Sequence, residues 1–93
     1  MELKIGSVVQ NQSGHDKGFF AVVKIDGPFV YMANGKSRLL NSPKKKNPKH
    51  LILTKAILDM DSITTDRKLR AALWPFNYGG AGEQIVVERD SLG

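Results

Sequence analysis

The stretch FFAVVKIDGPFVYMANG, residues 19–35, decides the expected fold, because each of its two apolar runs is followed by a tight-turn signal. Residues 19–25 and 29–33 are rich in β-branched and aromatic side chains and predict two strands. The dipeptides Asp26-Gly27 and Asn34-Gly35 predict turns, and Asn-Gly is suited to the positive φ angles of a type I′ hairpin. The stretch therefore predicts consecutive antiparallel hairpins.

Further short strands are expected on both sides of this stretch. Residues 5–11, 36–41 and 50–54 combine apolar or β-branched side chains with flanking turn residues. Five short strands joined by tight turns favour a small, strongly bent antiparallel barrel. The expected fold class is therefore mostly β.

The Asn34-Gly35 turn assigns faces to the strands beside it. A two-residue loop would pair Tyr31 with Arg38 across the hairpin. Alternation then gives an inward apolar face made by Val30, Met32 and Leu39. The opposite face would carry Tyr31, Lys36 and Arg38. A cation beside an aromatic ring suits base stacking and phosphate binding, but it also occurs in ordinary cross-strand pairs, and both interpretations stay open.

The strand at residues 19–25 alternates in the same way. Its apolar face is expected to hold Phe19, Ala21, Val23 and Ile25. Phe20 then shares the other face with Lys24. Phe20 is therefore either an exposed ring or, if the strand is strongly bent, a second buried one.

A helix is expected near the C-terminus. Thr64 or Thr65 can cap it, and a single apolar stripe follows at helical spacing, made by Leu69, Ala72 and Leu73. Trp74-Pro75 is expected to end it, because a residue before proline disfavours helical geometry. The predicted organisation is a barrel with a basic loop over residues 1–60, a packed helix over 61–76 and a glycine-rich, mobile tail over 77–93.

Length and composition narrow the function classes. A chain of 93 residues makes one small domain, in which a deep catalytic cleft is not expected. It has no cysteine, so disulfides and cysteine-rich zinc sites are excluded. No segment reaches the roughly 18 apolar residues of a membrane span, and no signal peptide is evident. We expect a monomeric cytoplasmic protein.

Positive charge is concentrated in the middle of the chain. The net charge is +5, and half of the 14 basic residues lie between residues 36 and 55, where there is no acidic residue. Pro43 and Pro48 bracket a lysine run and are expected to keep it extended without sheet hydrogen bonds. Such a stretch attracts phosphates, although a solvated surface run has the same composition.

Two segments carry a resemblance to a known family. GSVVQNQSGHDKGFFAVVKI (residues 6–25) resembles the KOW motif of several ribosomal proteins, with Gly18 at the glycine that defines the motif and Lys17 at the basic residue before it. ANGKSRLL (33–40) followed by PKKKNPKHL (43–51) resembles small bacterial KOW-domain RNA-binding proteins. The resemblance covers roughly residues 3–54.

The resemblance implies an SH3-like barrel that binds RNA through the sugar-phosphate backbone. Its partners would be ribosomal or other structured RNA and, through it, ribosomal proteins. With the outward face described above, the predicted contacts are Lys17, Gly18, Tyr31, Lys36, Arg38, Lys44, Lys45, Lys46, Lys49 and His50. One departure is Phe19, which stands where the family often has a basic or polar residue.

Other functions have less support. The two histidines lie far apart and make no metal signature, and no phosphate-binding loop or catalytic arrangement is present. We therefore expect no enzyme activity, no cofactor and no metal. The alternative to RNA binding is an SH3-like protein-interaction module that uses the helix and the Trp74-Pro75-Phe76 knob.

Overall fold

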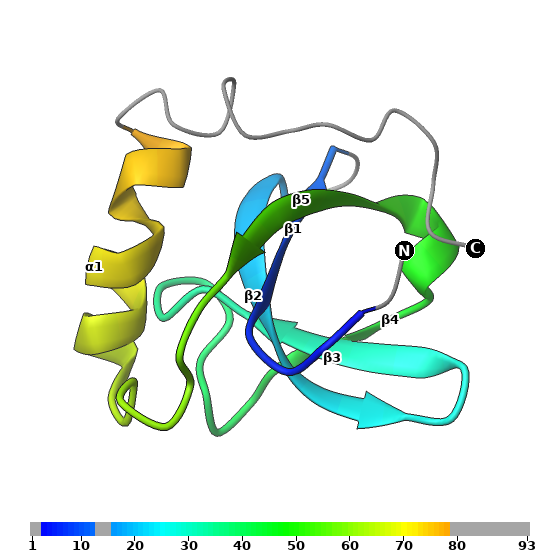
Figure 1. Ribbon diagram of the computed structural model, residues 1–93, viewed down its shortest axis with the longest axis horizontal. Helices are drawn as coiled ribbons and strands as arrows, with labels where there is room; N and C mark the ends of the chain where they lie inside the picture. The colour runs from blue at the N-terminus through cyan, green and yellow to red at the C-terminus, as the bar shows by residue number, and fades with distance from the viewer. Residues whose placement is uncertain (1–2, 13–15, 79–93) are drawn as a thin grey trace.

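The protein folds into one antiparallel five-stranded sheet with a C-terminal helix packed against it (Figure 1). The computed structural model describes residues 3–12 and 16–78. The strands are β1 (Ser7–Asn11), β2 (Gly18–Asp26), β3 (Phe29–Ala33), β4 (Lys44–Lys46) and β5 (Leu51–Ile57). The remaining elements are a 3-10 turn, η1 (Pro48–His50), and the helix α1 (Asp66–Asn77). The expected mostly β fold with five antiparallel strands and one C-terminal helix is confirmed.

The sheet is strongly curled, because its two outermost strands are neighbours in sequence. The strand order is β4-β3-β2-β1-β5, so β4 and β5 lie on opposite edges. Strands spaced about 4.8 Å apart would separate the edges of a flat five-stranded sheet by about 19 Å. Only residues 47–50 connect β4 to β5, and most of them form η1, which rises only about 2 Å per residue. The sheet must therefore bend, although no ladder between β4 and β5 closes it within the described residues (Figure 1).

Strand β2 is buried on both faces of this sheet. Phe20 and Val22 face the inside of the curl and pack there with side chains from the other strands, namely Val9, Val30, Met32, Leu51 and Leu53. Phe19 and Ala21 face the outside and pack under α1 with Val8, Ala33, Leu69 and Leu73. Of the two possibilities for Phe20, the structure shows the buried ring.

A β-bulge changes the alternation halfway along β2. Val22 pairs with Met32 on β3, but the next pair is Lys24 with Tyr31, so Val23 is an extra residue on β2. Without this bulge, Lys24 would follow Val22 toward the inside of the curl, because alternate residues share a face. The predicted apolar face therefore extends from Phe19 and Ala21 only to Val23, which packs partly buried beside them, and the prediction is wrong at Ile25, which is exposed.

The predicted strand at residues 36–41 and its type I′ hairpin are also wrong. The backbone N–H groups of Asn34 and Gly35 both donate to the Arg38 carbonyl, each at 2.9 Å. The Asn34 side-chain Oδ1 accepts in turn from the N–H groups of Lys36 and Arg38 at 2.9 and 3.0 Å. An Asn side chain that satisfies nearby backbone donors replaces the ladder with a compact loop.

The actual partner of β3 on this side is β4. Its register pairs Val30 with Lys46, Tyr31 with Lys45 and Met32 with Lys44. The predicted pairs of β3 with Lys36, Ser37, Arg38 and Leu39 do not form. Leu39, expected inside, is 42% exposed.

The loop after β3 is anchored to the beginning of α1. Asp66 Oδ1 accepts from the Leu40 N–H at 2.8 Å, and Arg70 Nη1 donates to the Gly35 carbonyl at 3.1 Å. Gly35 has a φ of +76° and lies directly against the Asp66 carbonyl, so a side chain has neither a favourable φ nor space. These contacts fix the loop relative to the helix.

Helix α1 begins as predicted but ends later. Thr65 is the N-cap, and its side chain accepts from the Lys68 N–H at 3.2 Å. The predicted end at Trp74 is wrong, because the helix continues through Pro75 to Asn77. Tertiary contacts at the last turn outweigh the proline. The Asn77 side chain accepts from the Phe19 N–H at 2.9 Å and donates to the Phe19 carbonyl at 3.4 Å.

The remaining boundaries differ in smaller ways from the sequence-based expectations. β1 begins at Ser7 rather than residue 5, and β5 extends to Ile57 rather than residue 54. The predicted mobile tail starts at residue 77, but Asn77 ends α1. Residues 79–93 of that tail lie outside the described residues.

A paired substitution tests how tightly the loop is packed on α1. We expect Gly35→Ala to lower the free energy of unfolding by about 2–5 kcal/mol, because it combines a left-handed φ with a clash against Asp66. Gly27 also has a positive φ of +60°, but nothing lies within 4 Å of an added Cβ. Gly27→Ala should therefore cost only about 1–2 kcal/mol in denaturant unfolding. Equal losses in the two variants would contradict the packing.

Candidate nucleic-acid interface

A row of cationic and aromatic side chains crosses the outer sheet face where α1 does not cover it. Lys24, Tyr31 and Lys45 are direct cross-strand partners on β2, β3 and β4, so their side chains share one face. The Lys24 Nζ lies 5.3 Å from the centre of the Tyr31 ring, and the Lys45 Nζ lies 4.5 Å from that of Phe29. Both lysines are exposed, and both rings are half-buried. We call these four residues the cation–aromatic row.

The bulge in β2 and the end of the α1 contact together produce this row. The bulge brings Lys24 to the outer face, and α1 packs only over the earlier part of that face, at Phe19, Ala21 and Ala33. An ammonium near an aromatic face is stabilised by the ring while it stays available to an anion. Rings beside such cations can stack on bases, and the ammonium groups can contact phosphates. Asp26 is the cross-strand partner of Phe29, so an acidic residue stands at the end of the row.

The lysine run does not behave as the sequence predicted. Lys44–Lys46 was expected to be extended without sheet bonds, but it forms the edge strand β4. Its residues therefore alternate. Lys45 belongs to the cation–aromatic row, whereas Lys44 and Lys46 pair with Met32 and Val30 and are half-buried on the other side.

Arg38 does not lie beside Tyr31 as predicted, because Asp16 binds it. Its guanidinium donates to both carboxylate oxygens, from Nε at 3.0 Å and from Nη2 at 2.8 Å. Hydrogen bonding from Arg38 lowers the pKa of Asp16 below its ordinary value, although burial acts to raise it. The positive charges of Arg38, Lys44 and Lys46 also lower the pKa of Asp16. The same pair raises the pKa of Arg38. The two-point geometry holds the start of β2 against the loop after β3.

The other predicted contacts lie at three separate places. Gly18 begins β2 with a φ of +118°, and Asn77 Oδ1 would lie 2.9 Å from an added Cβ. The backbone conformation and the close contact with Asn77 therefore explain a glycine at this position. Lys17 and Lys36 line a pocket between the loop after β3 and α1. Lys49 and His50 are exposed on η1, which Asn47 caps by accepting from the Lys49 N–H at 3.1 Å. The ten predicted residues therefore do not form one surface.

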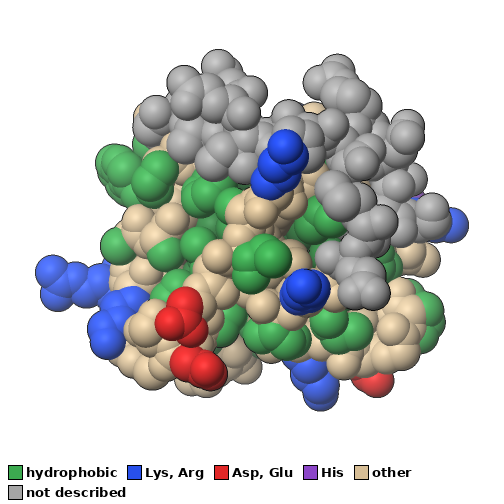
Figure 2. All heavy atoms as spheres, viewed as in Figure 1, with side chains coloured by type: hydrophobic (Ala, Val, Ile, Leu, Met, Phe, Trp, Pro, Cys, Tyr) green, Lys and Arg blue, Asp and Glu red, His purple; other side chains and the backbone are tan. Residues whose placement is uncertain are grey.

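The space-filling view agrees with this dispersed arrangement. On the face shown in Figure 2, the Lys and Arg side chains are spread over the surface, with hydrophobic and uncharged surface between most of them. Among the described residues of the sheet, the cation–aromatic row is the cluster of lysines and rings whose geometry the strand pairing defines.

Sequence reasoning missed several residues at these places. Lys24 and Phe29 were not predicted as contacts, because their position opposite Tyr31 and Lys45 depends on the bulge and on the β3–β4 register. Arg67 and Arg70 on α1, and Tyr78 directly after it, line the pocket with Trp74. The four-residue spacing of Trp74 and Tyr78 is the signal that could have indicated a shared helix face.

Comparison with known proteins leaves the site to be interpreted from its own chemistry. No protein-family model matches the chain, and no curated protein matches it. Within residues 3–12 and 16–78, no helix is long and apolar enough to cross a membrane. The same residues contain no group of three or more His, Asp or Glu side chains placed to hold a metal ion.

The Asp16–Arg38 pair predicts a pH-dependent stability. Because the pKa of Asp16 is lowered on folding, its contribution to the free energy of unfolding is present above pH ~4 and is lost as the pH falls through the folded-state pKa. Asp16→Asn should therefore unfold at lower denaturant concentration than the parent at pH 7. The difference should shrink steadily below pH ~4.

The matched control is Asp61→Asn, which removes an exposed carboxylate outside this pair. It should leave the denaturation midpoint nearly unchanged at pH 7. A loss for Asp16→Asn that stays constant down to the lowest accessible pH would argue against the ion pair.

Proposed function

We propose that this protein binds structured RNA by gripping its sugar-phosphate backbone with the outer face of β2, β3 and β4. The observation that carries the proposal is the cation–aromatic row, in which two exposed lysines stand over two rings on an open sheet face. Cations of this kind position a phosphate backbone without reading sequence, and the adjacent rings suit unpaired bases.

The proposal includes an SH3-like barrel of the KOW type. Strands β1 to β4 form a meander and β5 returns to pair with β1, which is the connectivity that such a barrel requires. Only the seam between β4 and β5 lacks a ladder among the described strands. The positive φ of Gly18 supports the match of this residue to the glycine of the KOW motif.

The resemblance to KOW-domain proteins makes ribosomal RNA the first RNA to test. Lys44 and Lys46 add positive charge on the other side of the β4 edge, and Lys49 adds a further charge on η1, which follows β4 directly. A barrel that binds peptides does not need this charge. Binding rather than catalysis is proposed because the cations and rings form a contact surface.

A double substitution tests the lysines of the row. We expect Lys24→Gln with Lys45→Gln to weaken binding to structured RNA roughly tenfold or more at about 100 mM salt, equally for different sequences. The slope of log affinity against log salt should flatten by about 1.5, because two phosphate contacts are lost. Filter binding or fluorescence anisotropy at several salt concentrations measures both quantities.

The matched control carries the same charge change at exposed positions outside the row, Lys55→Gln with Lys68→Gln. This control variant should retain most of the parent's affinity, and its salt slope should be steeper than that of the Lys24→Gln with Lys45→Gln variant. If both double variants lose the same affinity, the row is only part of a general positive field. If the parent binds no RNA, the protein-interaction module becomes the better interpretation.

A second substitution tests stacking by the ring at the centre of the row. Tyr31→Ala should cost about 1–3 kcal/mol in binding to looped or single-stranded RNA and little for duplex RNA. Tyr31→Phe keeps the ring and should restore the affinity. An equal loss in the Phe variant would show that the hydroxyl, not stacking, is responsible, and thermal melting of each variant checks that the fold is intact.

A further inference from the structure

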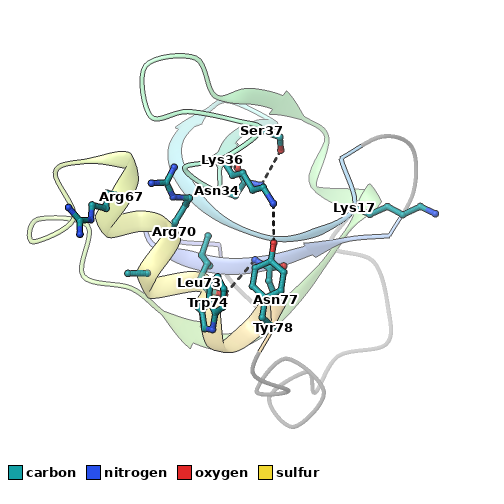
Figure 3. A pocket seen from close by; sticks show the side chains of 11 residues that line it. Lys17, Asn34, Lys36, Ser37, Arg67, Arg70, Leu73, Trp74, Asn77 and Tyr78 are labelled. Carbon is teal, nitrogen blue, oxygen red and sulfur yellow. Dashed lines mark hydrogen bonds between the residues drawn. The ribbon is translucent and has the colours of Figure 1, made fainter.

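A second surface with cationic and aromatic side chains lies in the pocket between α1 and the loop after β3 (Figure 3). Its volume is about 710 Å³, within the range of about 300–1,000 Å³ typical of small-molecule sites. The loop that forms one wall is anchored to α1 by the Arg70–Gly35 hydrogen bond. The pocket therefore has two walls that are held together.

The floor of the pocket includes two aromatic side chains that the hydrophobic core does not use. Trp74 lies on the last turns of α1 and Tyr78 is the residue directly after the helix, with ring centres 4.4 Å apart and an angle of 39° between the rings. Each is 59% exposed, which is unusual for such large side chains. An exposed ring face of such a pair offers an apolar surface on which a third aromatic ring can stack.

Cations lie around this aromatic pair, and none of the described residues that line the pocket is acidic. Lys36 Nζ lies 3.3 Å from the Tyr78 hydroxyl and 5.9 Å from the centre of its ring. Figure 3 shows Lys36 directed toward Tyr78, with Lys17 and Arg67 at opposite rims and their charged ends turned outward. The pocket thus combines a stacking surface, one cation above it and further cations at both sides.

We propose that this pocket binds one unpaired nucleotide, with the base stacked on Trp74 and Tyr78 and a phosphate held by Lys36. The inference rests on the proposed RNA-binding function and names a second contact for the same ligand. A base and a phosphate need the two features that the pocket places together, an aromatic face and a nearby ammonium.

The position of the rim cations favours a nucleotide within a strand over a free one. Lys17 and Arg67 point away from the aromatic pair on opposite sides, where the phosphates before and after the stacked base would pass. A free nucleoside monophosphate has no groups that would reach both rims. A short single-stranded oligonucleotide should therefore bind more tightly than the monophosphate of the same base.

The protein contains its own reporter for this site. Trp74 is the only tryptophan in the chain, so its fluorescence reports directly on the pocket. The full chain is titrated with four probes, namely a single-stranded RNA tetranucleotide, a nucleoside 5′-monophosphate, the nucleoside and inorganic phosphate. We expect saturable quenching by the tetranucleotide, weaker binding of the monophosphate by about tenfold, and still weaker binding of the last two.

Three variants assign the binding to these residues. Tyr78→Ala should weaken tetranucleotide binding about tenfold through lost stacking, and Lys36→Gln should weaken it several-fold and flatten its salt dependence. Lys68→Gln is the matched control, since this lysine lies on α1 but does not line the pocket. It should bind like the parent, and thermal melting of all three variants shows whether α1 is retained.

The outcomes separate this inference from the proposed function. If the parent and Tyr78→Ala bind structured RNA equally and no nucleotide probe quenches Trp74, the pocket inference is wrong while the row remains supported. Phosphate that binds as tightly as the monophosphate would reduce the pocket to an anion site and overturn the inference. Quenching by the monophosphate in a protein that binds no RNA would overturn both the RNA source of the nucleotide and the proposed function.

Discussion

The burial of β2 on both faces is the constraint on which the rest of the structure depends. Phe20 and Val22 fill the inside of the curled sheet, while Phe19 and Ala21 form the surface to which α1 binds. Two layers can be built on one strand only while its side chains alternate between two apolar environments. The bulge at Val23 ends that arrangement and brings Lys24 outward, so the same strand supplies both cores and the first cation of the open face.

Much of this fold follows from local sequence, but the parts that depend on distant partners do not. The run at residues 29–33 predicts β3 correctly because its alternation and flanking turns are local signals. The Asn34-Gly35 dipeptide misleads, because the Asn34 side chain satisfies the donors that a hairpin would have paired. Pro75 misleads in the same way, since the hydrogen bonds between the Asn77 side chain and the Phe19 backbone, which lies outside the helix, hold the last helical turn.

The candidate site is less predictable than the fold, because a cluster of lysines in the sequence does not indicate which face of the sheet each side chain occupies. The lysine run indicates a positive surface, yet strand pairing turns Lys45 away from its two neighbours. Arg38 is neutralised by Asp16, a residue 22 positions away that no local pattern connects to it. The outward orientation of Tyr31 was predicted correctly, because it depends only on the alternation within β3. Its neighbours were not, because they come from other strands.

The side chain of Asn77 has a further consequence for the behaviour of the protein at high concentration. Phe19 lies two residues before Ala21, the first residue of β2 that pairs with β3, so its outward N–H and carbonyl have no strand beside them. An unpaired strand segment of this kind is a template for pairing between molecules and hence for aggregation. The Asn77 amide offers one acceptor and one donor in the place of a neighbouring peptide group. The end of the helix thereby closes a short length of sheet that could otherwise join a second copy of the chain.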